Sequence, residues 1–339
     1  MITGFIALYL VSYSARIQSG DSLRFFDAGS SLARYGDTYL DESFWSLPPT
    51  IARPSQPYPL ESIDTTVETF NVQLIALIYR GIDAIPEIGY VHGVWLINIL
   101  MTALTIGVLF WYVILRGYTE LIALLTAISF GAGTLVWAYS KTLFREPQVM
   151  LWLMLAAFFL EIWQRRGYLK NPFTLLWFAA GIVSFLIALQ FKQAAIFALP
   201  ILIILILPFE RFIQHRLFRR LNHGLLFIAL SIPIVFVFVP ATLSAFISAL
   251  ADIMARAGAG NTQYVQTALH TYLFSIGGSI WGTSPVILLA LPGAYWLWKK
   301  RQYQQVWISL LILLSYAFGH AFLTGQHWFG GLSWSPRFL

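Results

Sequence analysis

Long apolar runs alternate with short polar connections along the chain, and they predict its helices. Runs that are apolar on every side of a helical projection are typical of membrane-spanning helices, which need about 20 residues to cross the hydrocarbon layer. The runs lie near 1–17, 92–115, 119–139, 147–163, 172–190, 194–209, 224–243, 284–298 and 305–323. The pattern therefore predicts an all-α fold, a multi-pass transmembrane helical bundle of about nine spans.

One further apolar segment is too short to be counted as a span. Residues 71–85 form this segment, and they include Arg80 and Asp83. Charges in a run shorter than the hydrocarbon thickness favour an interfacial or re-entrant position. We expect a lid or a juxtamembrane helix there.

Two long polar connections interrupt the series of spans, at 18–90 and at 244–283. Loops much longer than about 12–15 residues are usually functional or disordered. The first connection has eight acidic residues by position 68 and a series of prolines, which favours an ordered, extended structure over the membrane face. The second has a flexible centre rich in glycine and alanine. No further domain is evident, so residues 1–339 are predicted to form a single transmembrane domain.

Composition agrees with a membrane location. The chain is 58% hydrophobic and only 11% charged, whereas a soluble domain carries roughly a quarter charged residues. This excludes a large soluble catalytic domain. The chain has no cysteine, which also excludes disulfides, thiolate metal sites and a cysteine nucleophile.

The basic residues are distributed unevenly between the two sides of the predicted bundle. The short connections on one side contain 11 of the 21 basic residues, at Arg116, Arg165, Arg166, Lys170, Arg211, Arg216, Arg219, Arg220, Lys299, Lys300 and Arg301. Short basic connections face the cytoplasm. Both long connections are therefore predicted to be external, in a protein of the cell membrane. The net charge of +6 is explained by this sorting, so no nucleic-acid partner is expected.

Asp21 is the first candidate for chemistry, because it directly follows the first predicted helix. A carboxylate held partly away from water at the membrane boundary is suited to take a proton from a nucleophile. The alternative is that Asp21 or Ser22 caps the helix predicted to follow. Asp27 is nearly opposite on that helix and is predicted to be structural.

Arg145 and Glu146 form a second candidate pair, in an external turn before Pro147. Pro147 suits the first turn of a helix, and Glu146 suits the positive end of its dipole. The two charged side chains could instead face an external cavity. There Arg145 would bind a phosphate, and Glu146 a sugar, a divalent metal or an acceptor.

Lys192 lies between two apolar runs and has no acidic neighbour in the sequence. An unpaired charge in such a place is costly to bury, which makes it a functional candidate. The side chain could snorkel to the interface, but a lipid phosphate is the partner we favour.

The C-terminal stretch after the last predicted span contains His327, Trp328 and Arg337. Aromatic side chains there could stack on a sugar or belong to the interfacial belt. Arg337 could grip a phosphate with two hydrogen bonds. The absence of an HExxH motif and of paired histidines argues against a zinc site.

Five segments, which span nearly the whole chain in order, carry a resemblance to a known family. They are GDSLRFFDAGSSLARYGD (20–37), FREP (144–147), FKQAAIFALP (191–200), YLFSIGGSIWGTSPVILLALPG (272–293) and WFGGLSWSPRFL (328–339). Taken together, they resemble the polyprenyl-phosphate-dependent glycosyltransferases of the type-C superfamily, a group that includes protein O-mannosyltransferases and the bacterial aminoarabinose transferase.

The resemblance implies an inverting glycosyltransferase whose catalytic base is Asp21. The donor would be a polyprenyl-phosphate-linked sugar among the membrane lipids, and the acceptor a hydroxyl of a glycan, a lipid or a protein at the external face. Lys192, Arg337 and Arg145 would stabilise the leaving phosphate. Relatives often have a second acid beside the first; here that position is Ser22, and Glu146 could supply the carboxylate, with a divalent metal left open.

The resemblance also implies that the chain is a C-terminally truncated fragment of a longer protein, since relatives continue with further helices. We expect Asp21, Glu146, Lys192 and Arg337 to converge on one externally open cavity beside a groove for the isoprenoid. A multi-pass transporter or flippase of lipid-linked substrates is the alternative, and a non-catalytic assembly subunit is a third.

Overall fold

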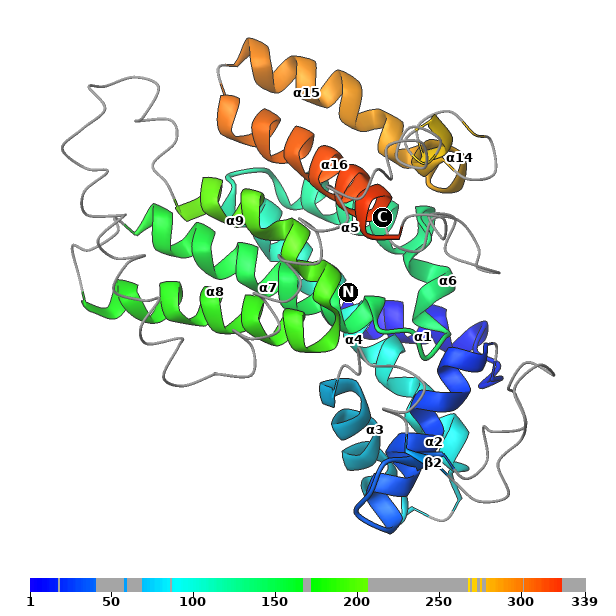
Figure 1. Ribbon diagram of the computed structural model, residues 1–339. Coiled ribbons are helices and arrows are strands. Elements are labelled where there is room, and N and C mark those ends of the chain that lie inside the picture. The colour runs from blue at the N-terminus through cyan, green and yellow to red at the C-terminus, as the bar shows by residue number, and fades with distance from the viewer. Residues whose placement is uncertain are drawn as a thin grey trace. The chain divides into compact units, whose positions relative to one another are not determined.

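The structure is a computed structural model, and the chain that it describes is mostly helical (Figure 1). The description covers residues 1–17, 19–40, 58–59, 69–85, 87–166, 172–206, 268, 270–272, 275, 279–300 and 302–324. The prediction of an all-α fold is confirmed for these residues, in which the strands β1 (Tyr39–Leu40) and β2 (Tyr58–Pro59) form one short antiparallel pair.

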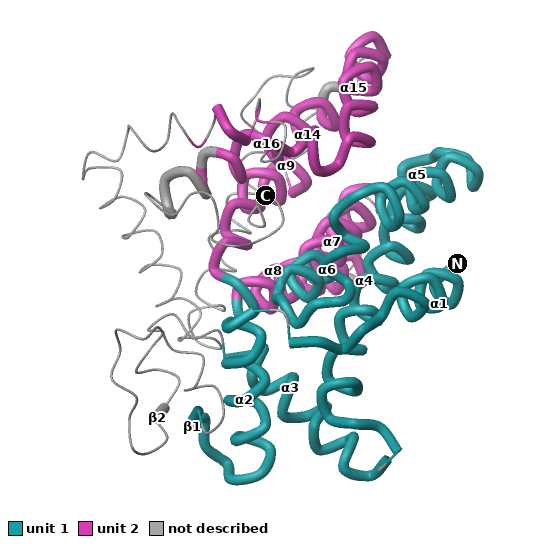
Figure 2. Tube along the Cα trace, turned by 90° about the vertical axis from the view of Figure 1, so that its right-hand side faces the viewer, with its two compact units in different colours: residues 1–152, 190–192 teal, residues 153–189, 193–339 magenta. Residues whose placement is uncertain are grey.

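The chain divides into two compact units, shown in different colours in Figure 2. Unit 1 consists of Met1–Trp152 together with Gln190–Lys192, and unit 2 of Leu153–Leu189 together with Gln193–Leu339. Residues 190–192 thus belong to the same unit as residues 1–152, although the 37 residues between them belong to unit 2.

Among the residues that the structure describes, three helices are long and apolar enough to cross a membrane. They are α4 (Tyr90–Leu115), α7 (Glu146–Arg165) and α8 (Pro172–Phe191). Large apolar side chains such as Trp111 and Leu176 are exposed on them, which suits a surrounding of lipid rather than water. These helices indicate a membrane protein.

The predicted span at 119–139 is broken into α5 (Glu120–Gly133) and α6 (Val136–Ser140). Glycines at the end of α5 have low helix propensity. Thr134 then competes for the backbone: its hydroxyl donates to the carbonyl of Phe130 at 2.6 Å and accepts the amide of Val136 at 3.2 Å. Local side-chain bonds of this kind end helices.

Other predicted spans are also shorter or interrupted. Their elements are α1 (Ile2–Val11), the 3₁₀ helix η4 (Gln193–Ala198) with α9 (Leu199–Ile206), and the 3₁₀ helix η5 (Pro285–Leu289) with α15 (Ala290–Lys299). The short helix α14 (Ile280–Thr283) precedes η5, and the run predicted at 305–323 is one continuous helix, α16 (Tyr303–Thr324). The predicted span at 224–243 lies outside the described residues. Nine spans are therefore not confirmed, and the described part of the chain contains three helices of spanning length and character.

In the described part of the first long connection lie the helices α2 (Gly20–Arg34) and α3 (Thr69–Ile82). Val72, Ile75 and Tyr79 are buried on one side of α3, a spacing typical of an amphipathic helix. The predicted short helix over this segment is confirmed, and its position at the membrane interface stays a prediction. Of the second connection, 244–283, only residues near its end are described, and its glycine-rich centre lies outside them.

Helices α2, α3 and α4 enclose the first hydrophobic core of unit 1. Phe26 packs edge-on against Trp95, with ring centroids 5.6 Å apart, and Trp95 is fully buried. Gly29 allows α2 and α3 to approach closely, because a Cβ at this position would collide with the side chain of Ile75. The close approach holds the start of α2, and with it Asp21, in a defined place in unit 1.

The second core of unit 1 joins α1, α4 and α5. Phe5, Tyr9 and Ile106 are buried there, and the Tyr9 hydroxyl donates to the carbonyl of Gly131 at 2.9 Å. The turn from α4 to α5 includes Gly117 at φ +89°, a backbone conformation that suits glycine at the C-terminal end of a helix.

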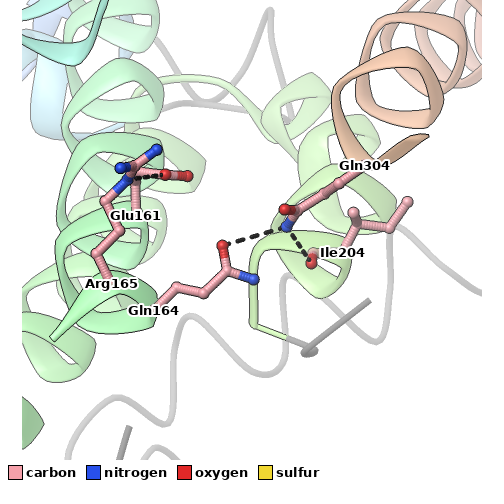
Figure 3. A network of polar contacts seen from close by, with 5 residues as sticks. All are labelled: Glu161, Gln164, Arg165, Ile204 and Gln304. Carbon is pink, nitrogen blue, oxygen red and sulfur yellow. Dashed lines mark hydrogen bonds and ion pairs between the residues drawn. The ribbon is translucent and has the colours of Figure 1, made fainter. Parts of the chain in front are cut away.

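Unit 2 is built around α7, α8, η4, α9 and α16. Buried Leu160, Phe185 and Phe197 belong to its core. Figure 3 shows its polar contacts: the side-chain amide of Gln304 on α16 donates at 3.2 Å both to Gln164 and to the carbonyl of Ile204. Gln304 is buried, so these bonds satisfy an amide that water does not reach.

Candidate functional site

The candidate site begins at the N-terminal end of α2, where Asp21 occupies the first turn. The helix is capped by Ser19, whose hydroxyl oxygen accepts the amide of Ser22 at 3.1 Å. The alternative interpretation of Asp21 or Ser22 as the cap is therefore wrong, since the chain turns into the helix two residues earlier. The carboxylate of Asp21 still suits the positive end of the helix dipole, and the residue is only partly buried.

Arg145 lies against α2 one turn beyond Asp21. Its guanidinium carbon is 4.6 Å from the ring centroid of Phe25, within the range of a cation–π interaction. Asp21 and Phe25 are four residues apart on one helix, so they share a face. The structure thus brings the turn before α7 to the face of α2 that carries Asp21, although 120 residues separate the two segments.

Glu146 and Lys192 form an ion pair in the same unit. The Lys192 ammonium is 2.7 Å from Glu146 Oε1, and the side chains are 12% and 23% exposed respectively. Glu146 is the first residue of α7, followed by Pro147 in the first turn, as predicted. Both charges are mostly withdrawn from water and still within reach of a polar ligand.

The ion pair with Glu146 changes the interpretation of Lys192. The sequence places no acid near it, whereas the fold supplies Glu146 from 46 residues earlier. A lipid phosphate is therefore not needed to explain how this charge is accommodated, and a phosphate role for Lys192 stays a proposal. Lys192 lies at the break between α8 and η4, where Phe191 packs edge-on against Phe70 with centroids 6.0 Å apart.

A buried amide network positions the Arg145–Glu146 turn, and the sequence analysis missed it. Asn98 on α4 is fully buried and donates to the carbonyls of Thr142 and Phe144 at 2.6 and 2.7 Å. Its oxygen accepts the side-chain amide of Gln148 at 2.6 Å. An amide inside an apolar run is the signal that could have found it, because a polar group there is costly unless it is bonded.

A divalent metal does not fit the described surroundings of Glu146. Its Oε1 already binds an ammonium group, and no group of three or more histidine, aspartate or glutamate residues gathers within the described ranges. Divalent cations need several oxygen or nitrogen ligands at once. No step of the chemistry below is therefore assigned to a metal.

The remaining predicted residues divide into two sets. His327, Trp328 and Arg337 lie outside the described residues. Asp27 is buried, at 1% exposure, in keeping with a structural role.

A cavity of about 710 Å³ lies in unit 1, but Asp21, Arg145, Glu146 and Lys192 are not among the described residues that line it. The segments that carry Asp21, Arg145–Glu146 and Lys192 belong to unit 1, and the convergence predicted with Arg337 on one externally open cavity stays a prediction.

Comparisons of the chain with protein-family models, curated proteins and solved structures return no match. The fold and the apolar helices define a mostly helical membrane protein.

Proposed function

We propose that the protein is a membrane glycosyltransferase that moves a sugar from a polyprenyl-phosphate donor to an acceptor hydroxyl. The observation that carries the proposal is the gathering of charged groups in unit 1. Arg145 lies on the Asp21 face of α2, and the adjacent Glu146 binds Lys192. One carboxylate for proton transfer and two cations for a phosphate suit displacement of a lipid phosphate at a sugar carbon.

The reaction would be a single displacement. The acceptor oxygen forms a bond to the anomeric carbon while the bond from that carbon to the phosphate oxygen breaks. The hydroxyl proton passes to the Asp21 carboxylate, and the electron pair of the broken bond leaves on the polyprenyl phosphate. Attack opposite the leaving group inverts the anomeric centre.

Arg145 and Lys192 would stabilise the charge that develops on the leaving phosphate. Lys192 would exchange its bond with Glu146 for one with the phosphate, and the released Glu146 carboxylate would accept a hydroxyl of the sugar. The resting ion pair thereby holds both side chains near their working positions, which lowers the cost of ordering them when the donor binds.

The test is sugar transfer from a radiolabelled polyprenyl-phosphate donor by the full-length protein in membranes. Asp21→Asn should lower turnover about 100-fold or more, because a general base contributes about 10²–10⁴ in rate. Asp37→Asn is the matched control: it makes the same change in the same connection, at a carboxylate that accepts the amide of Tyr39, and should leave turnover near wild type. Equal turnover of the two variants would remove Asp21 from the mechanism.

A lipid transporter is the second candidate, and the break at Lys192 favours it. α8 ends at Phe191 and η4 begins at Gln193, and interrupted helices often form the substrate sites of transporters. In proteoliposomes, a transporter would move a fluorescent lipid-linked sugar between leaflets with no acceptor present and no cleavage of the sugar–phosphate bond. The glycosyltransferase should cleave that bond only when an acceptor is added.

A further inference from the structure

The cavity of about 710 Å³ in unit 1 is lined by none of the residues Asp21, Arg145, Glu146 and Lys192. Its wall includes Arg16 beyond the end of α1, Arg34 on α2, Tyr79 on α3, and Tyr90 and His92 at the start of α4. This volume is in the range of small-molecule sites, about 300–1,000 Å³. Its residues come from four separate segments, so the folded unit creates it.

The charge of the wall is positive. Two arginines contribute this charge, and no aspartate or glutamate is among the described residues that line the cavity. Asp83 lies nearby and accepts the Tyr90 hydroxyl at 2.6 Å, outside the lining. Such a wall favours an anionic ligand.

Arg34 is held in place by aromatic rings. The rings of Tyr79 and Tyr90 are stacked, with centroids 4.1 Å apart and planes within 4°, and the Arg34 guanidinium carbon lies 5.1 and 5.7 Å from the two centroids. Arg34 also donates to the Tyr79 hydroxyl. A guanidinium ordered in this way loses less freedom when it binds a planar or tetrahedral anion.

The start of α4 adds a second source of positive potential. Gly89 is the N-cap of this 26-residue helix and provides no side chain to cap it. The first amides of an α-helix have no carbonyl partner within the helix, and they carry the positive end of its dipole. The residues that provide these amides, 90–92, line the cavity.

The backbone beside Arg16 is strained. Ala15 is buried and has φ 44°, the left-handed region that a residue with a Cβ rarely adopts. Such strain persists only where the surroundings impose it, and it gathers at binding sites. Two residues before Ala15, the Tyr13 hydroxyl donates to the carbonyl of His92 and joins this segment to the start of α4.

We propose that this cavity binds the phosphate group of an anionic ligand, with Arg16, Arg34 and the first amides of α4 as its contacts. A phosphate on an anionic lipid headgroup and a soluble phosphate ester share this chemistry. Because α4 is long enough to span a membrane, its end marks the depth at which headgroups lie. The proposal does not depend on glycosyl transfer.

The test is binding of radiolabelled phosphatidylglycerol to the purified full-length protein, with phosphatidylcholine as the zwitterionic comparison. Wild type should bind phosphatidylglycerol at least tenfold more tightly. Arg16→Gln with Arg34→Gln should remove that preference, and Arg16→Gln alone should weaken binding severalfold while leaving the tyrosine stack intact. Arg116→Gln, at the other end of α4, is the matched control and should bind as wild type does.

Competition identifies the source of the phosphate. If glycerol 3-phosphate displaces the lipid, and the arginine variants weaken its binding too, the site belongs to a soluble phosphate ester. Variant-sensitive lipid binding without displacement would assign it to a headgroup. Equal binding of the two lipids by wild type, or full binding by a double variant that elutes as folded protein, would overturn the proposal. A loss of transfer in Asp21→Asn has no bearing on these outcomes.

Discussion

The two ends of α7 carry ion pairs that differ in origin. At its start, in unit 1, Glu146 pairs with Lys192 from a segment 46 residues later. Near its end, in unit 2, Glu161 pairs with Arg165 one turn onward at 2.6 Å, as Figure 3 shows. The second pair follows from helical spacing alone, whereas the first exists only because the chain returns to unit 1.

The pairs differ in exposure as well. The Glu161 carboxylate is 1% exposed beneath an arginine that is 42% exposed, so the arginine covers a buried acid. Lys192 and Glu146 are both partly open, and Arg145 directly precedes Glu146 in the sequence. The Glu161–Arg165 pair, in which the arginine covers the acid, therefore contributes to the stability of its helix. The Glu146–Lys192 pair stays accessible to a ligand and can take part in a reaction.

The largest expected difference between the two regions is in activity. Lys192→Met removes a cation proposed to stabilise the leaving phosphate, so transfer should fall about 100- to 1,000-fold, the loss typical of one electrostatic stabiliser. Arg165→Met removes a cation of the other pair and should keep transfer within a few-fold of wild type. Radiolabelled transfer per folded protein measures both. Similar losses in the two variants would contradict the division of roles, and Lys192→Arg should restore part of the rate.

The next largest effect, on both stability and activity, is expected at Asn98, whose side-chain amide holds the Arg145–Glu146 turn. Asn98→Ala removes three hydrogen bonds from a buried position, at about 1 kcal/mol each, and should lower stability by about 3 kcal/mol. Transfer by the remaining folded protein should fall too, because the turn loses its support. Thermal inactivation in detergent and kcat at low temperature separate the two effects. A stable variant with normal kcat would show that the network does not position the turn.

A smaller effect is expected in unit 2, at the polar contact of α16. Gln304→Leu removes the donor shared by Gln164 and the Ile204 carbonyl, which should lower stability by about 1–2 kcal/mol. Transfer per folded molecule should not change, in contrast to Asn98→Ala. The midpoint of thermal inactivation measures stability, and kcat measures transfer per folded molecule. A selective fall in kcat would assign unit 2 a direct part in the reaction.

The smallest effect is expected from Arg165→Lys on stability. Lysine keeps a positive charge over the buried Glu161 carboxylate, and Arg165 is itself 42% exposed, so the loss should be about 0.5 kcal/mol or less. Thermal inactivation in detergent measures the difference from wild type. A loss as large as that of Asn98→Ala would mean that the local pair supports more of unit 2 than its spacing suggests.

The sequence predicts helices well where apolar runs are uninterrupted, as in α4, α7 and α8. It predicts their ends less well, because local polar bonds decide these: Thr134 breaks the run between α5 and α6, and Ser19 rather than Asp21 caps α2. Lys192 is a candidate from the sequence because an unpaired charge between apolar runs is costly to bury. Its partner could not be predicted, since nothing in the sequence links Lys192 to Glu146.

What the sequence by itself determined is the class of the molecule and the position of its apolar helices, since burial in lipid depends on composition and length. Only the tertiary structure decided which charges meet. Ion pairs and hydrogen bonds act over a few ångströms, so the contact of Arg145 with Phe25, the pair of Glu146 with Lys192 and the cavity beside Arg34 arise only when distant segments pack together.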